Sequence, residues 1–296
     1  MPDSKRLIVI TGPTASGKTA ITIKLAEYFK TEILSADSRQ FYRGMDIGTA
    51  KPTREELSRV KHHFIDSLNA DEKYNINLYE KDALEILNKL FQKHDVVFMT
   101  GGSGMYIDAV CHGMDELPDS VPEMREKLNN IMLTQGLDVL QKMLLEKDPE
   151  YYAEADINNP HRVIRALEVN LLSGKKFSTL RKGLKKKREF SISKIGILAD
   201  RDELYARINH RVDEMIMSGL VDEVRSLLPY RHEQSMQTVG YKEIVSYLDK
   251  YITLEQAVLL IKQNTRNYAK RQMTWMRRDK EVDWRYVEEI TYDSIL

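Results

Sequence analysis

The pattern Gly12-Pro-Thr-Ala-Ser-Gly-Lys-Thr19 places two glycines, a lysine and a threonine at the spacing GxxxxGK[ST]. The residues before it, Arg6–Thr11, are apolar and β-branched and predict a buried strand, while Lys18–Phe29 has the pattern of a helix. Glycines here let backbone N–H groups curl around a phosphate, and the N-terminus of the helix points its positive end at the anion. The segment therefore predicts a phosphate-binding loop between a strand and a helix.

Two side chains of this loop carry charge or a metal-binding oxygen. Lys18 neutralises phosphate oxygens, and the Thr19 hydroxyl can ligate Mg²⁺. A glycine-rich turn without a ligand is the alternative, and the flanking strand and helix favour the phosphate site. We expect the whole loop to bind phosphate, namely Gly12, Pro13, Thr14, Ala15, Ser16, Gly17, Lys18 and Thr19.

The first part of the chain alternates between strand and helix patterns. Glu32–Asp37 and Asp95–Thr100 predict buried strands, and Ile76–Lys93 repeats apolar residues at helical spacing. Such alternation is typical of a parallel sheet covered by helices on both faces. We therefore predict an α/β protein with a P-loop NTPase-like parallel sheet core.

The pattern then changes to helices alone. Helices are expected to begin at Pro122, to span Leu137–Lys147, and to run from Asn159-Pro160 to Gly174, before Ser191–Ala199 returns as a strand. The simplest account is an inserted all-helical domain. We predict a first core part at residues 1–116, the insertion at 117–188, and a second core part with a helical C-terminal region at 189–296.

Composition limits the class of protein. No run of about 18 apolar residues exists, which excludes a membrane span. The single cysteine, Cys111, rules out an intramolecular disulfide and fits a reducing cytosol, so a cytoplasmic location is expected. The formal net charge is zero, yet Arg181–Arg188 and Arg266–Lys280 are strongly basic, so a basic face can still exist.

An acidic residue follows the second predicted strand. Because ligands of parallel sheets sit at the carboxyl ends of strands, Asp37 is expected near the phosphate loop, where it could accept a proton. A solvated loop or a helix cap is the alternative. The strand Asp95–Thr100 ends without the acidic residue that holds Mg²⁺ in nucleotide-hydrolysing enzymes, which weakens an ATPase interpretation without excluding a kinase.

Several further blocks occur in a fixed order along the chain, and together they resemble the tRNA dimethylallyltransferase family, also called tRNA isopentenyltransferase. The resemblance covers almost the whole chain. It rests on GPTASGKT, DSRQ, MDIGTAKP (Met45–Pro52), HHFID (His62–Asp66), GGSGMY (Gly101–Tyr106), NNPHRVIRALEV (Asn158–Val169), QTVGYKE (Gln237–Glu243) and TRNYAKRQMTW (Thr265–Trp275). Ser103 stands where Thr is usual in the family and keeps the hydroxyl.

The resemblance implies transfer of a dimethylallyl group from dimethylallyl diphosphate to N6 of the tRNA adenosine next to the anticodon. The phosphate loop and Mg²⁺ would then hold a diphosphate leaving group, with Lys18, Thr19 and Arg211 as catalytic residues and Asp37 as the group that holds N6 and takes its proton. The partner would be the tRNA anticodon stem-loop, with no membrane, and a monomer is expected. The tRNA-binding residues implied are Asp37, Ser38, Arg39, Gln40, Ser103, His161, Arg162, Val163, Ile164, Arg165, Gln237, Thr238, Val239, Gly240, Tyr241 and Lys242.

Alternatives stay open at this point. A P-loop kinase with the insertion as its lid would transfer phosphate from ATP, and a non-catalytic RNA-binding module would bind RNA without turnover. Several basic residues also have a structural alternative: Arg211 as a surface charge on an amphipathic helix, Arg162 and Arg165 as a solvated face, and Arg181–Arg188 as a solvated linker.

Overall fold

The computed structural model describes residues 5–295. Its centre is a six-stranded sheet in the order β3-β2-β4-β1-β5-β6, and every neighbouring pair is parallel. The α/β class with a P-loop-like parallel sheet is thereby confirmed. The strands are β1 (Arg6–Thr11), β2 (Ile33–Ser35), β3 (His62–His63), β4 (Val96–Gly101), β5 (Ser191–Ile197) and β6 (Val282–Arg285).

Successive residues of the central strand face opposite sides of the sheet, because side chains alternate along a strand. Leu7 and Val9 belong to one apolar core, whereas Ile8 and Ile10 belong to the core on the other face. All four are fully buried. A strand that is apolar at every position therefore lies at the centre of the sheet with both faces covered.

The chain divides into two compact units, the first formed by residues 1–111 and 187–296 and the second by residues 112–186. The first unit contains the sheet and most of the long helices. In it lie α1 (Lys18–Tyr28), α2 (Arg54–Arg59), α3 (Ile76–Leu90), α4 (Gly104–His112, whose last residue begins the second unit), α10 (Arg201–Met217), α11 (Leu220–Ser226), α12 (Tyr241–Leu248) and α13 (Leu254–Met276), with 3₁₀ turns η1 (Leu228–Tyr230), η2 (Val287–Glu289) and η3 (Asp293–Ile295).

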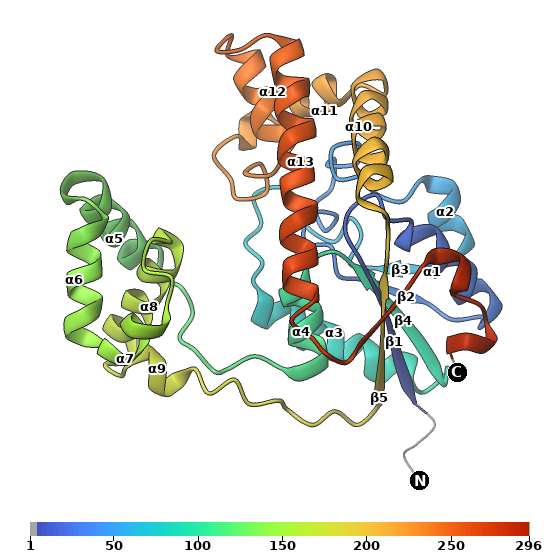
Figure 1. Ribbon diagram of the computed structural model, residues 1–296, viewed down its shortest axis with the longest axis horizontal. Coiled ribbons are helices and arrows are strands. Elements are labelled where there is room, and N and C mark those ends of the chain that lie inside the picture. The colour runs from blue at the N-terminus through green and yellow to red at the C-terminus, as the bar shows by residue number, and fades with distance from the viewer. Residues whose placement is uncertain (1–4, 296) are drawn as a thin grey trace. The chain divides into compact units, whose positions relative to one another are not determined.

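Helix α10 continues from the end of β5, and α11 to α13 pack with it in one group on the side where the central strands end (Figure 1). The register pairs Ile10 with both Thr100 and Ile195, so β1, β4 and β5 end close together. The loops after β1, β2 and β4 are therefore positioned next to the α10–α13 group.

The second unit is entirely helical within its described residues. Its core contains Leu128, Leu140, Leu144 and Leu167, all with at most 1% exposure. The expected insertion, residues 117–188, compares with 112–186 in the structure. Its helices are α5 (Pro122–Gln135), α6 (Leu137–Lys147), α7 (Pro149–Glu154), α8 (Pro160–Ser173) and α9 (Phe177–Leu180).

The helix expected over Leu137–Lys147 ends at Lys147, and Pro149 begins the next helix. Asp148 explains the restart, because its side chain accepts the N–H of Tyr151 and caps α7. Across residues 5–295 the helices are either too short or too polar to cross a membrane.

Candidate functional site

The phosphate-binding loop leaves β1 and enters α1, as its sequence predicts. Gly17 caps the helix with a left-handed backbone, at φ 88°, and Ala15 also has a positive φ of 63°. The Lys18 ammonium turns back over the loop and donates to the Pro13 carbonyl at 3.2 Å. The loop is thus formed and folded around the lysine.

A side chain from the far end of the sequence fixes this loop. Gln272 of α13 accepts the N–H of Thr14 at 2.9 Å and donates to the Gly102 carbonyl at 3.0 Å. Gln272 is buried, and its bond to the Gly102 carbonyl is shielded from water. Helix α13 therefore ties the loop after β1 to the glycine-rich turn after β4.

Two cations meet at the phosphate-binding loop. Desolvation lowers the pKa of Lys18 to about 8; nearby Asp37 raises that pKa and Arg211 lowers it further. The Arg211 guanidinium lies 3.5 Å from the Thr14 hydroxyl. Burial lowers the pKa of Arg211 as well. Burying two cations side by side is unfavourable unless an anion joins them.

The turn after β2 brings Asp37 to the same place. Its carboxylate accepts the N–H of Arg39 at 3.1 Å, and the next residue, Ser38, donates its N–H to the Ser103 hydroxyl at 3.1 Å. Ala36 donates to the Thr100 carbonyl, which joins the ends of β2 and β4. Asp37 is therefore positioned by its own turn and by the glycine-rich turn.

Two pockets open here, and both belong to the first unit. The first pocket, of about 630 Å³, is lined by Lys18 and Thr19 among other residues. The second pocket, of about 380 Å³, contains Tyr268 of α13. The two share their wall, which consists of Thr14, Asp37, Thr49, Ala50, Arg211 and Met215. Asp37 and Arg211 thus face both spaces.

Known proteins share this sequence and this fold. The family model for IPP transferases matches residues 40–279. The tRNA dimethylallyltransferase of Christiangramia forsetii is 50% identical over 95% of this chain and 93% of its own. The corresponding figures for tRNA dimethylallyltransferase 1 of Bacteroides fragilis are 49%, 97% and 95%.

The chain belongs to the tRNA dimethylallyltransferase family.

Solved structures agree with this assignment. A tRNA isopentenylpyrophosphate transferase from Bacillus halodurans matches with a TM-score of 0.70 at 38% identity, covering 98% of this chain and 92% of its own. A eukaryotic dimethylallyltransferase acting on tRNA matches with a TM-score of 0.79 at 25% identity, covering 96% and 74%. The family membership expected from the ordered sequence blocks is confirmed.

Most tRNA-binding residues implied by the family resemblance that lie in the first unit face the second pocket. The second pocket is lined on one side by Asp37, Ser38 and Arg39 and on another by Gln237–Gly240 and Lys242. Three residues of the implied set in this unit are placed otherwise. Ser103 does not line the second pocket, and its hydroxyl accepts the N–H of Ser38. Tyr241 is fully buried and donates to Glu223, and Gln40 uses its amide to hold the Thr49 and Ala50 carbonyls.

Helix α13 contributes residues to the second pocket that were absent from our sequence-based site. Thr265, Tyr268 and Gln272 line it, three and four residues apart on one face of the helix. Burial and the charge of Asp37 raise the pKa of Tyr268 to about 12, so its hydroxyl remains a hydrogen-bond donor. The helical spacing within the block TRNYAKRQMTW is the signal that could have identified them.

The RNA-binding residues implied for the second unit fall into two groups, one exposed and one buried or internally bonded. His161 and Arg162 are exposed at the start of α8. Val163 and Ile164 are buried in the helical core, at 0% and 4% exposure, so their side chains are not accessible to RNA in this structure. Arg165 is used internally, because it donates to the buried Glu168 at 2.9 Å and to the Pro118 carbonyl at 2.7 Å.

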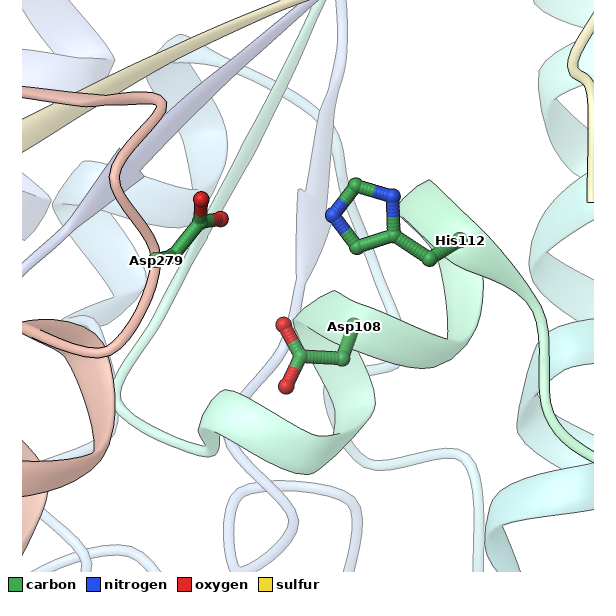
Figure 2. Close-up of side chains that lie close together, drawn as sticks. All are labelled: Asp108, His112 and Asp279. Atoms are coloured by element: carbon green, nitrogen blue, oxygen red, sulfur yellow. The ribbon is translucent and has the colours of Figure 1, made fainter. Parts of the chain in front are cut away.

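A separate group of residues has the side-chain types of a metal site. Asp108 and His112 on α4 and Asp279 after α13 point toward one another, with one potential ligand atom of each within 4.8 Å of the others (Figure 2). Both carboxylates already have partners: Trp275 donates to Asp108 at 3.0 Å, and the buried Lys194 donates to Asp279 at 2.5 Å. Lys194 thus places a positive charge beside Asp279, and it also pairs with Glu281 at 3.3 Å.

Proposed function

We propose that this protein transfers a dimethylallyl group from dimethylallyl diphosphate to N6 of the adenosine next to the anticodon of tRNA. One observation supports this proposal above the others: Asp37 and Arg211 line both the first pocket, beside Lys18 and Thr19, and the adjoining second pocket. A diphosphate in the first pocket and a base in the second would meet at this shared wall. Membership of the family gives the reaction class.

In this proposal the bond from the prenyl carbon to the diphosphate oxygen breaks as the bond from that carbon to N6 forms. Lys18 and Arg211 hold the diphosphate together with the N–H groups at the start of α1. Negative charge grows on the departing diphosphate, so these fixed positive groups stabilise the transition state more than the bound substrate. The expelled diphosphate keeps the electron pair of the broken bond.

The second part of the chemistry is loss of a proton from N6. The proposed acceptor is the carboxylate of Asp37, which its own turn holds at the shared wall. A positioned base typically contributes a factor of about 10² to 10⁴ in rate. Tyr268 lies in the same pocket as a further hydrogen-bond donor.

The residues of the first pocket fit a magnesium ion. Thr19 and Ser35, which carry hydroxyls, line it together with Asp37, which carries a carboxylate, and Mg²⁺ prefers such oxygen ligands. Thr19 is the residue proposed to hold the ion. When bound, Mg²⁺ would add positive charge on the diphosphate oxygens.

The RNA part of the proposal uses both units. An adenine stacked in an anticodon loop cannot reach a recessed carboxylate, so the base must leave the stack and enter the second pocket, which costs a few kcal/mol. Gln237–Gly240 and Lys242 line that pocket, and the exposed His161 and Arg162 of the second unit are proposed to contact the anticodon stem-loop. A monomer is the proposed active form.

A kinase is disfavoured by the family membership, and nucleotide hydrolysis by the residues that end β4. Thr100 and Gly101 stand where nucleotide-hydrolysing enzymes usually carry a Mg²⁺-binding acid. One assay separates the alternatives: the protein is incubated with dimethylallyl diphosphate, ATP and unmodified tRNA, and the products are identified. We expect prenylated adenosine and free diphosphate with ATP intact. ATP consumption with phosphoryl transfer, or RNA binding without any product, would contradict the proposal.

A further inference from the structure

The loop of residues 45–52 forms part of both pockets. Thr49 and Ala50 line the first and the second pocket, and Gly48 lines the second. A loop in this place must keep one conformation if the two substrates are to meet in register, because a displacement of about 1 Å at a reacting centre can cost a factor of 10². The contacts that hold the loop are therefore of functional interest.

Glu223 on α11 holds this loop by its backbone. One carboxylate oxygen accepts the N–H groups of Asp46 at 2.9 Å and of Ile47 at 2.7 Å. The other accepts the N–H of Gly48 at 3.0 Å and the hydroxyl of Tyr241 at 2.6 Å. Hydrogen bonds to a charged group are about twice as strong as those between neutral groups. Successive backbone N–H groups form a site that can bind an anion, and here the anion is the protein's own carboxylate.

The same contact reaches a second segment that lines the second pocket. Tyr241 begins α12, directly after the pocket-lining Gly240. Its ring fills the space beside Gly48, where an added Cβ would lie 2.5 Å from a ring carbon. Gly48 and Gly240, from segments far apart in the sequence, thus border one continuous wall joined through Glu223.

Two further side chains, Lys51 and Gln40, bind the same loop, but they contact groups other than those bound by Glu223. Lys51, whose side chain is 4% exposed, bridges Asp46 and Asp66. Gln40 holds the carbonyls of Thr49 and Ala50. These anchors engage other groups, so the N–H groups of residues 46–48 depend on Glu223.

We propose that Glu223 is a positioning residue that sets the wall shared by the two pockets, although it lines neither of them in this structure. The inference rests on the proposed function for what the wall positions. It requires that the carboxylate act on the loop and on Tyr241 together. Loss of the charge should loosen residues 46–48, lower kcat and leave diphosphate binding at Lys18 nearly unchanged.

The test uses Glu223→Gln in the full chain, with Asp222→Asn as the matched control. Asp222 is its exposed neighbour on α11, paired with Arg225. Gln keeps the size of Glu but replaces one accepting oxygen with an NH₂ group, which cannot accept the N–H groups it faces. We expect hydrogen exchange to quicken about tenfold or more in a peptide covering Met45–Lys51, and kcat to fall about tenfold with an unchanged Kd for dimethylallyl diphosphate. Tyr241→Phe, which removes one donor and keeps the ring, should give a smaller change in the same direction.

Unchanged exchange at residues 46–48, or an unchanged kcat, would overturn the proposal. Faster exchange spread over the whole sheet would also overturn it, because Glu223 would then only support the fold. The exchange measurement needs no substrate, so it can succeed or fail independently of the proposed prenyl transfer.

Discussion

Arg211 in the first unit and Arg165 in the second are both helical arginines that the sequence suggests as substrate-binding residues, yet their surroundings differ. Arg211 lies beside the Thr14 hydroxyl and faces two open pockets. Arg165 is bound to the buried Glu168, which Arg125 also contacts at 2.7 Å. The difference shows that an arginine is available to a ligand only where the protein has not already supplied its acceptor.

The two regions therefore face opposite electrostatic problems. In the first unit, Lys18 and Arg211 place two positive charges in a recess, and desolvation, with a smaller contribution from Arg211, lowers the pKa of Lys18. In the second unit, Glu168 has 0% side-chain exposure and needs its two arginines to compensate its burial. In the proposed function a bound diphosphate completes the first arrangement, whereas the second arrangement is complete without a ligand.

The largest expected effect tests the incomplete arrangement. Lys18→Ala removes the charge that the phosphate-binding loop folds around, so binding of dimethylallyl diphosphate should fall sharply and turnover should drop by roughly 10³. Isothermal titration and a turnover assay would measure this. Unchanged affinity for the diphosphate would remove the basis for assigning the loop as its site.

The next effect tests the complete arrangement. Glu168→Ala leaves Arg125 and Arg165 without their buried acceptor and should destabilise the second unit by about 3 kcal/mol. Hydrogen exchange in α5–α8 would report it, with the exposed Glu126→Ala as control. Diphosphate affinity should be unaffected. Wild-type protection in α5–α8 would show that the ion pairs contribute little.

The smallest effect compares two arginines of α8. Arg162→Ala should weaken binding of the anticodon stem-loop several-fold and reduce the slope of log affinity against log salt by about 1, with stability unchanged. Arg165→Ala should instead lower stability, because its partner Glu168 is buried. Binding titrations over a range of salt concentrations measure both. Equal salt slopes for Arg162→Ala and the wild type would mean that Arg162 makes no phosphate contact.

Much of the fold was predictable because local patterns decide it. The strands around the phosphate-binding loop are continuous apolar runs. The helix predicted over Leu137–Lys147 has the same bounds as α6. The short strands β3 and β6 escaped prediction. His62–His63 and Val282–Arg285 carry no apolar run of their own and pair only with a neighbouring strand that the sheet supplies.

The site was predictable where a motif is local and unpredictable where it depends on distant contacts. The phosphate-binding loop and Asp37 meet as expected from the rule that strand ends gather at one edge. Gln272 and Glu223 act through bonds to residues far away in sequence, which periodicity cannot show. Tyr241 and Val163 lie within the sequence blocks shared with the family, but their side chains are buried in the core. The cytoplasmic location stays a prediction.

The most direct test of the account separates binding from chemistry at Asp37. Asp37→Asn keeps the shape of the turn and removes the base, while Lys18, Arg211 and the loop amides remain. The measurement is single-turnover prenylation of unmodified tRNA, with the affinity for dimethylallyl diphosphate determined on the same sample. The account predicts wild-type diphosphate affinity and a rate of prenyl transfer lower by roughly 10² or more. Prenyl transfer at a rate near that of the wild type would contradict it.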